Sequence, residues 1–357
     1  MPSSPPRRGH PYHMHDAIYA QPGALRLLTR GQGATLTAAA ARLAAAPRLW
    51  LTGIGSSWHA ALVGEALLAR VGGLGPRVRA IDAFDLVQYG ADADQAAVVA
   101  ITHRGTNRYT GAALSRARAA GAAAIAVTGK SGDGPAGAEH VLRTVEPEAS
   151  SCHTVSYTCA LAMLAALAAA VGGDDATARD LEAIPDLLAM LLGQESWEEL
   201  AARFAGRRRY WFVGGGPNLA TAYEGALKLS EAAWMSAVGL GCEQFLHGPW
   251  AALEPDDVVV LIAPPGPSHA RCLDVARVAA EIGAPVVALV AEDDREIAPL
   301  AAETIALPGV AELLSPIVAV VPLQLLTYHL AVKAGANPDT MRAEQPAYGR
   351  ARAVAGS

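Results

Sequence analysis

The chain has 357 residues, of which 52% are hydrophobic and 17% charged, so it is long enough for two domains with separate cores. Its net charge of -6 leaves no basic excess to hold a nucleic-acid backbone. The longest apolar run, around residues 159–171, is short and alanine-rich, so neither a membrane span nor a membrane partner is expected. No apolar segment follows Arg7 and Arg8 as in a secretory signal, and the four cysteines form no CxxC pair. These features indicate a soluble, cytoplasmic protein with reduced thiols.

Residues 1–30 are expected to form a flexible arm, which opens with MPSSPPRRGHP, and a lead-in helix that Pro22 interrupts. The imidazoles of His10, His13 and His15 could in principle bind a metal ion. No cluster of carboxylates accompanies them, so we predict neither a metal site nor a cofactor.

Residues 31–173 alternate short apolar runs with amphipathic helices. The runs RLWLTGIG, AAVVAITH and AAAIAVTG each lead into a turn, HVLRTV follows, and a long apolar helix ends the segment near Val171. This alternation is typical of a doubly wound parallel sheet with helices on both faces. The segment is therefore predicted to be one α/β domain.

The same arrangement returns in residues 207–335, after a helical linker at 174–206, and a tail at 336–357 follows. Equivalent positions of the two segments are separated by nearly the same number of residues. The three pairs are Gly53 and Gly214 (214 − 53 = 161), Ile101 and Ile262 (262 − 101 = 161), and Ile125 and Val287 (287 − 125 = 162). A constant offset across strands and turns predicts two α/β domains related by internal duplication.

Two turns of the first half could hold an anion, because ligands of open α/β sheets bind beyond the carboxyl ends of the strands. One is Gly53-Ile54-Gly55-Ser56-Ser57, and the other is Thr102-His103-Arg104-Gly105-Thr106-Asn107. Hydroxyl groups and the N–H groups at a helix start would receive a phosphate, and arginine would add charge. Equally, glycine, serine and asparagine are ordinary turn and cap residues.

The stretch TAYEGALKLSEAAWMSAVGLGCEQFLHGP, from Thr221 to Pro249, carries the most chemistry. Glu224, Lys228 and Glu231 are spaced i, i+4, i+7, so they share one stripe of a helix, and His247 follows. A carboxylate, an ammonium and an imidazole suit proton transfer next to a carbonyl. The alternative is a solvated helix face with an ordinary ion pair and a loop histidine.

The motifs EGALKLSE and LHGP, together with IYAQPGAL near the N-terminus, resemble the double sugar isomerase (SIS) domain family. The similarity is strongest to the isomerase half of glucosamine-6-phosphate synthase and to amino-sugar-phosphate deaminases of this family. It implies two tandem SIS domains, each with a flavodoxin-like, doubly wound parallel sheet. It also implies a homodimer, because such enzymes donate the histidine across the dimer interface.

The same resemblance implies roles for particular residues. Glu231 matches the isomerising glutamate, Lys228 the helix lysine and His247 the ring-opening histidine. The residues matched to sugar or phosphate binding are Ser56, Ser57, Thr102, His103, Arg104, Thr106, Asn107, Glu148, His153 and Thr154.

Three features depart from the family pattern. Arg104 stands where the phosphate loop usually has a serine, and His153 also replaces a serine. The tail has arginines but no lysine beyond Lys333, whereas the family ends with a lysine that opens the ring or forms an imine. The chain begins with Met1-Pro2 without a leading cysteine, so no N-terminal glutaminase is expected.

The sequence therefore predicts a sugar-phosphate isomerase or deaminase that acts on a phosphorylated amino sugar without its own glutaminase domain. The expected partners are a small-molecule sugar phosphate and a second copy of the chain. Two alternatives stay open, a non-catalytic sugar-phosphate sensor and the isomerase subunit of a split amidotransferase.

Overall fold

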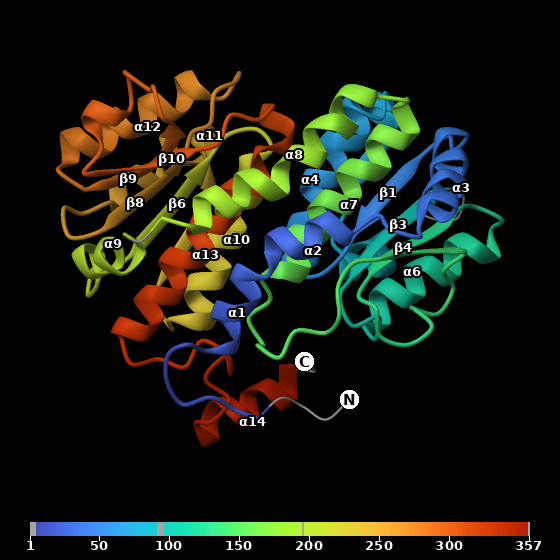
Figure 1. Cartoon of the computed structure of the whole chain (residues 1–357), viewed down its shortest axis with the longest axis horizontal. Coiled ribbons are helices and arrows are strands. Elements are labelled where there is room, and N and C mark those ends of the chain that lie inside the picture. Colours follow the sequence, from blue (N-terminus) through green and yellow to red (C-terminus); the bar gives the residue numbers. More distant parts are fainter. Residues whose placement is uncertain (1–4, 91–95, 195, 356–357) are drawn as a thin grey trace. The chain divides into compact units, whose positions relative to one another are not determined.

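The computed structural model describes residues 5–90, 96–194 and 196–355. Its contacts divide the chain into two compact units (Figure 1). The first unit comprises Ala20–Pro147 and Val155–Leu188, and the second comprises Met1–Tyr19, Glu148–Thr154 and Ala189–Ser357. The domain boundaries expected from the sequence stay a prediction. Residues 1–4 of the expected arm, 195 of the linker and 356–357 of the tail lie outside the described residues.

The first unit is built on a parallel sheet whose described strands follow the order β2-β1-β3-β4-β5. Its strands are β1 (Leu49–Thr52), β2 (Val78–Ala80), β3 (Ala97–Thr102), β4 (Ala124–Thr128) and β5 (His140–Arg143). Its helices are α2 (Gln21–Leu27), α3 (Gly33–Ala44), α4 (Ser56–Arg70), α5 (Ala83–Tyr89), α6 (Arg108–Ala119), α7 (Val155–Gly172) and most of α8 (Asp175–Leu192). Every residue of β3 and β4 is buried, as central strands of a covered sheet require.

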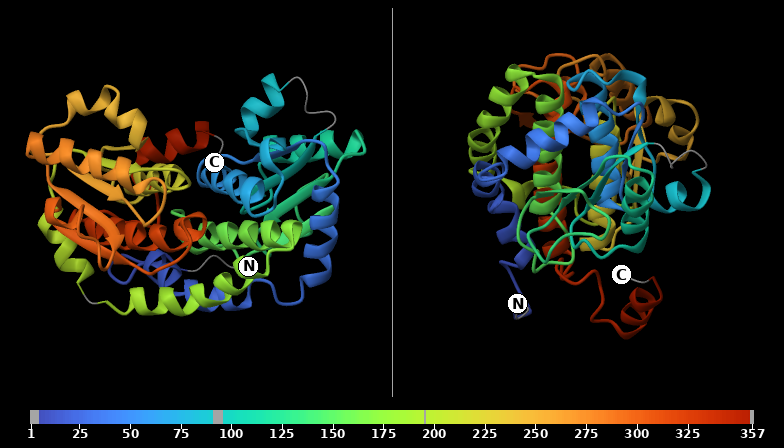
Figure 2. Two further views of the ribbon diagram at one scale, coloured as in Figure 1. Left: turned by 90° about the horizontal axis from the view of Figure 1, so that it is seen from above. Right: turned by 90° about the vertical axis from the view of Figure 1, so that its right-hand side faces the viewer.

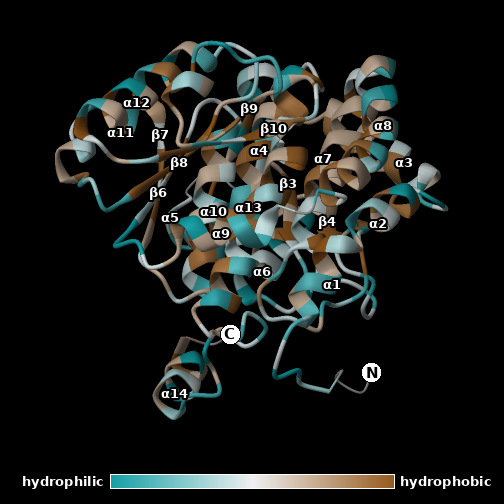
Figure 3. Ribbon diagram, turned by 60° about the vertical axis from the view of Figure 1, so that its left-hand side comes forward, coloured by the Kyte–Doolittle hydropathy of each residue, from teal (hydrophilic) through white to brown (hydrophobic). Residues whose placement is uncertain are grey.

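The second unit has a parallel sheet in the order β10-β9-β8-β6-β7. Its strands are β6 (Tyr210–Gly214), β7 (Ala237–Gly241), β8 (Val258–Ile262), β9 (Val286–Ala291) and β10 (Glu303–Leu307). Its helices are α1 (His13–Tyr19), α9 (Trp197–Phe204), α10 (Asn218–Ala232), α11 (Cys242–Leu246), α12 (His269–Ile282), α13 (Ser315–Lys333) and α14 (Pro346–Ala355). Helices cover both faces of each sheet (Figure 2), and the central strands are hydrophobic (Figure 3).

The two sheets share one topology and one register. Read from the other edge, the second order is β7-β6-β8-β9-β10, which matches β2-β1-β3-β4-β5 element for element. Leu49 pairs with Ala97, and Tyr210 pairs with Val258, so both partners shift by 161 residues (210 − 49 and 258 − 97). The predicted duplication of a flavodoxin-like, doubly wound sheet is confirmed.

A glycine at the same place in each unit lets a helix approach its sheet. A Cβ atom on Gly64 of α4 would lie 2.4 Å from the Leu51 side chain, and one on Gly225 of α10 would lie 2.6 Å from Phe212. The two glycines are also 161 residues apart (225 − 64). Close helix–sheet packing is therefore part of the duplicated design, and a larger residue at either position would push the helix away.

Two helices are long and apolar enough to cross a membrane, Val155–Gly172 and the segment Glu312–Lys333. Their apolar windows are 78% and 89% buried inside the structure, respectively. Such burial is typical of core helices, and α7 packs on α4 as α13 packs on α10.

Residues 5–19 make defined contacts within the second unit. The carboxylate of Asp339 accepts hydrogen bonds from the backbone N–H groups of His13 (2.9 Å) and Met14 (2.8 Å) at the start of α1. The hydroxyl of Tyr328 on α13 lies 2.7 Å from Nδ1 of His10. These contacts hold the lead-in helix to the tail and to the core helix, while the flexibility expected of the arm at residues 1–11 stays a prediction.

Candidate active site

The predicted stripe of α10 faces inward. Glu224 is 0% exposed, Lys228 2% and the Glu231 side chain 16%. The Nζ atom of Lys228 lies 3.5 Å from Oε1 of Glu224 and also donates a hydrogen bond to Oε2 of Glu231. The alternative interpretation of a solvated helix face is therefore wrong. Glu224, Lys228 and Glu231 form a buried cluster, which we call the α10 cluster.

Lys228 stays a cation in this cluster. Burial alone would lower its pKa, but the carboxylates of Glu231 and Glu224 outweigh burial and raise the pKa well above its ordinary value. A buried ammonium is stable only when it is paired and hydrogen-bonded, and the two carboxylates meet both conditions. The cluster thus presents a fixed positive charge beside Glu231, the member that retains access to solvent.

The loop 148–154 closes on itself through Glu148. Its carboxylate accepts hydrogen bonds from the backbone N–H of Thr154 (2.9 and 3.1 Å) and from the Thr154 hydroxyl (3.1 Å). His153 is half-buried within this loop. The carboxylate of Glu148 therefore shapes the loop and places Thr154 directly before α7.

The same loop lies beside the α10 cluster. Cys152 is fully buried, and its pKa is raised well above the usual value by burial and then by the negative charge of Glu231. The positive charge of Lys228 acts on the thiol in the opposite direction. The structure thus brings the predicted sugar-contacting loop and the predicted catalytic carboxylate together within the second unit.

Arginines of the tail contact this region. Arg352 donates hydrogen bonds to the hydroxyl of Ser151 (3.2 Å) and to the carbonyl of Thr340 (3.3 Å). Arg342 stacks over the ring of Trp234, just beyond α10, at 5.0 Å. The tail therefore places the guanidinium of Arg352 beside the loop 148–154 and that of Arg342 beside Trp234.

His247 lies apart from the α10 cluster along the chain, directly after α11. Its side chain is 75% exposed. In the part of the chain that the structure describes, Nε2 of His247 shares a hydrogen bond with Oε2 of Glu243 at 3.1 Å. Gly248 follows with a φ of 136°, a backbone geometry that glycine adopts readily. The exposed imidazole is available to a ligand or to another chain.

The predicted anion loops follow the carboxyl ends of two neighbouring parallel strands of the first sheet, β1 and β3. Ser56 and Ser57 begin α4 directly after β1, and Thr102 ends β3, which is hydrogen-bonded to β1. A Cβ atom on Gly53 would lie 2.4 Å from the backbone of Ser57, so this turn is tight. In the order β2-β1-β3-β4-β5, the junction of β1 and β3 is the switch point where ligands of such folds bind.

The loop after β3 mixes structural and exposed side chains. Oδ1 of Asn107 accepts hydrogen bonds from the N–H groups of Tyr109 (2.9 Å) and Thr110 (3.2 Å), so Asn107 caps α6. The carbonyl of His103 accepts a hydrogen bond from Gly129 (2.9 Å). For Asn107, the simpler interpretation as a cap residue holds. The side chains of Arg104 and Thr106 are exposed and free to meet a ligand.

The corresponding switch point of the second unit is filled by a carboxylate of the chain. Ser268, the counterpart of Asn107 (107 + 161 = 268), donates a hydrogen bond from Oγ to Oε1 of Glu312 at 2.6 Å. A Cβ atom on Gly266, the counterpart of Gly105, would lie 2.6 Å from the Glu312 carboxyl carbon. Sequence patterns missed Glu312 because its contact spans 44 residues. At the second switch point, the described chain thus places a carboxylate of its own.

No group of three or more histidine, cysteine, aspartate or glutamate side chains within residues 5–90, 96–194 and 196–355 is arranged to hold a metal ion. The two candidate places for chemistry are the α10 cluster, which suits proton transfer, and the first switch point, which suits an anion.

A duplicated flavodoxin-like sheet with these features places the chain among the tandem doubly wound α/β proteins. The family model of the SIS domain matches residues 42–170 and 203–334, one match in each half, and the chain belongs to this family.

The glutamine–fructose-6-phosphate aminotransferase [isomerizing] of Thermococcus kodakarensis is 34% identical over 348 residues. The alignment covers 94% of this chain and 58% of that relative, so the chain spans little more than half of its length.

Two solved structures share the fold. Tagatose-6-phosphate ketose/aldose isomerase from Escherichia coli has a TM-score of 0.80 at 20% identity, covering 95% of this chain and 97% of that one. The C-terminal domain of glucosamine-fructose-6-phosphate aminotransferase from Francisella tularensis has a TM-score of 0.79 at 18% identity, covering 93% and 99%.

Proposed function

We propose that this chain is a sugar-phosphate isomerase or deaminase whose substrate is a phosphorylated amino sugar. The observation that carries the proposal is the α10 cluster, in which a buried cation contacts a carboxylate that retains limited access to solvent. Such a carboxylate suits transfer of a proton between C1 and C2 of an open-chain sugar. The names of the Thermococcus and Escherichia coli proteins support this class of reaction.

In this mechanism, Glu231 removes the proton from one carbon and returns it to the neighbouring carbon. The adjacent ammonium of Lys228 stabilises the negative charge that develops on the enediol oxygen. The positive charge of the Lys228 ammonium is held in place before the reaction, because Lys228 is fixed between the carboxylates of Glu224 and Glu231. His247 assists ring opening, which precedes the proton transfer for a cyclic substrate.

The phosphate is assigned to the first switch point. Ser56, Ser57 and Thr102 supply hydroxyl groups, the start of α4 supplies backbone N–H groups, and Arg104 supplies charge. Thr106 adds a further hydroxyl group. In the loop 148–154, His153 and Thr154 are assigned to the sugar, and Glu148 positions them.

A homodimer and a cytoplasmic location belong to the same proposal. The 75% exposure of His247 supports the first point, since an imidazole that serves the site of a second copy must project from its own subunit. No cofactor is required, because both proton transfers use side chains.

The second candidate is a non-catalytic sugar-phosphate sensor. The specific observation in its favour is that residues 336–357 contain arginines and no lysine. Arginine stays protonated at ordinary pH, so it cannot form an imine with the sugar.

Thermal unfolding with a panel of phosphorylated hexoses and hexosamines tests binding, and conversion of the same compounds tests catalysis. A ligand present at about 100 times its Kd stabilises the fold by about 2.7 kcal/mol. We expect stabilisation and conversion by phosphorylated sugars, with neither effect from the same sugars without phosphate. Stabilisation without conversion supports the sensor, and no stabilisation by any of them contradicts both candidates.

A further inference from the structure

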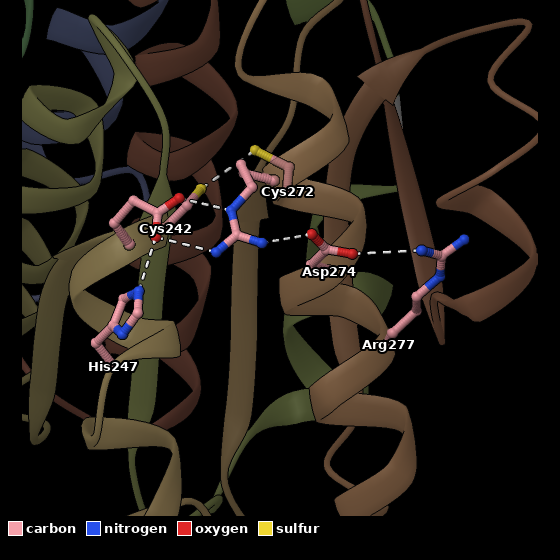
Figure 4. Close-up of polar contacts among 7 residues, drawn as sticks. Cys242, His247, Cys272, Asp274 and Arg277 are labelled. Atoms are coloured by element: carbon pink, nitrogen blue, oxygen red, sulfur yellow. Dashed lines mark hydrogen bonds and ion pairs between the residues drawn. The ribbon is translucent and has the colours of Figure 1, made fainter.

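Two buried thiols of the second unit contact each other, that of Cys242 on α11 and that of Cys272 on α12. The Sγ atoms of Cys242 and Cys272 are 3.5 Å apart (Figure 4). Cys242 is 4% exposed and Cys272 is 0% exposed, and both are free cysteines. Residues separated by 30 positions in sequence thus bring their sulfur atoms into direct contact.

The residues next to these cysteines are also paired. The guanidinium of Arg271 donates two hydrogen bonds to the carboxylate of Glu243, at 2.6 and 3.0 Å, and a third to Asp274 at 2.7 Å. Glu243 in turn lies 3.1 Å from the imidazole of His247. The helices α11 and α12 are therefore joined by two adjacent links, an exposed ionic link and a buried thiol pair, as Figure 4 shows.

We propose that Cys242 and Cys272 are a redox-active pair, and that their oxidation by a hydroperoxide to a disulfide locks α11, and with it His247, onto α12. The consequence for His247 rests on the proposed function, whereas the thiol chemistry does not. α11 has only five residues, so one covalent link near its start would restrain the whole helix.

The reaction balances with hydrogen peroxide as the oxidant. The thiolate of Cys242 attacks one oxygen, the O–O bond breaks, and hydroxide leaves, which gives a sulfenic acid. The Cys272 thiol then attacks the sulfenic sulfur, the S–O bond breaks, and the departing hydroxide takes the remaining proton as water. In sum, two thiols and one peroxide give one disulfide and two waters.

Exposure favours Cys242 as the first thiol to react, because it is 4% exposed whereas Cys272 is 0% exposed. Either sulfur can donate the hydrogen bond that joins them, so one thiol can ionise while the other keeps its proton. An attacking and a resolving cysteine need this arrangement.

Peroxide titration of the full-length protein, followed by peptide mapping under non-reducing conditions, tests the proposal. We expect a Cys242–Cys272 cross-linked peptide that dithiothreitol removes, in the wild type and in the control Cys159→Ala. Both Cys242→Ser and Cys272→Ala should lack it. Amide hydrogen exchange of α11 should slow by about tenfold on oxidation in the wild type and not in Cys272→Ala.

Three outcomes overturn the proposal. The first is a wild type in which both thiols stay free at peroxide levels that cross-link the unfolded chain, and the second is sulfinic acid at Cys242 beside an unlinked Cys272. The third is a cross-link that leaves exchange of α11 unchanged. These measurements need no turnover, so a chain that forms the disulfide but converts no sugar phosphate contradicts the proposed function and leaves the redox pair standing.

Discussion

Glu224 and Lys228 form an ion pair from which water is excluded, with Nζ 3.5 Å from Oε1 and exposures of 0% and 2%. A pair of this kind adds little net stability over apolar residues, because both charges lose their hydration. Its presence in the interior of α10 therefore calls for another role. It holds the cation that contacts Glu231.

Replacing Lys228 by methionine should destabilise the fold strongly, because the carboxylate of Glu224 would remain buried without a cation. Loss of one partner of a buried pair costs about 3–5 kcal/mol, which urea unfolding measures. Lys333→Met, at the exposed end of α13, is the matched control and should stay within about 0.5 kcal/mol of the wild type. Equal effects of the two substitutions would show that the pair is not buried in solution.

Arg104→Ala should weaken binding of a sugar phosphate without changing stability. A hydrogen bond to a charged group contributes about 1.5–3 kcal/mol, so we expect a loss of roughly 10- to 100-fold in affinity by calorimetry. Arg118→Ala, in the last turn of α6, is the control for a change in net charge. If the two variants bind equally well, the phosphate lies elsewhere.

Two substitutions of Asn107 distinguish its role as a helix cap from a role in ligand binding. Asn107→Ala should lower the free energy of unfolding by about 1 kcal/mol, because two N–H groups of α6 lose their acceptor. Asn107→Asp keeps the cap and should keep stability, but its negative charge should reduce affinity for a phosphate at this switch point. A destabilised Asn107→Asp variant would contradict the capping role.

Stability should fall as the pH drops from about 7 to about 5. Burial lowers the pKa of His15 and of His329 below the ordinary 6.5, and a hydrogen bond with Asp16 offsets this only in part for His15. The unfolded chain then binds protons at a higher pH than the folded chain, so the stability present above pH 6.5 is lost on acidification through the folded pKa values. Urea unfolding across this range should show a shallower dependence of stability on pH for His329→Gln than for the wild type, and an unchanged dependence would contradict the role of burial.

The sequence predicted the duplication because strands and turns keep their spacing, and Leu49 and Tyr210 indeed hold equivalent places. It did not predict β2 and β7. Both lie at a sheet edge, β2 has three residues, and β7 is partly exposed and contains two glycines. Edge strands with so few buried residues lack the hydrophobic run that marks β3 and β8.

The candidate site could be predicted only in part. The spacing of Glu224, Lys228 and Glu231 gives one helix stripe whether it faces solvent or the core. Its burial depends on elements far away in the sequence, among them α13 and the loop 148–154. The same holds for the carboxylate of Glu312 at the second switch point and for the thiol pair, since no local pattern encodes a contact over 30 or 44 residues.

Solvent deuterium incorporation into the sugar, compared between the wild type and Glu231→Gln, tests the central claim most directly. An amide keeps the shape of the carboxylate but is not a base, so exchange at C2 should fall by about 10²- to 10⁴-fold. Stabilisation by the bound sugar phosphate should persist in the variant, since Glu231 is not assigned to the phosphate. A wild type that binds sugar phosphates without exchange, or a Glu231→Gln variant that exchanges at the wild-type rate, would contradict the account.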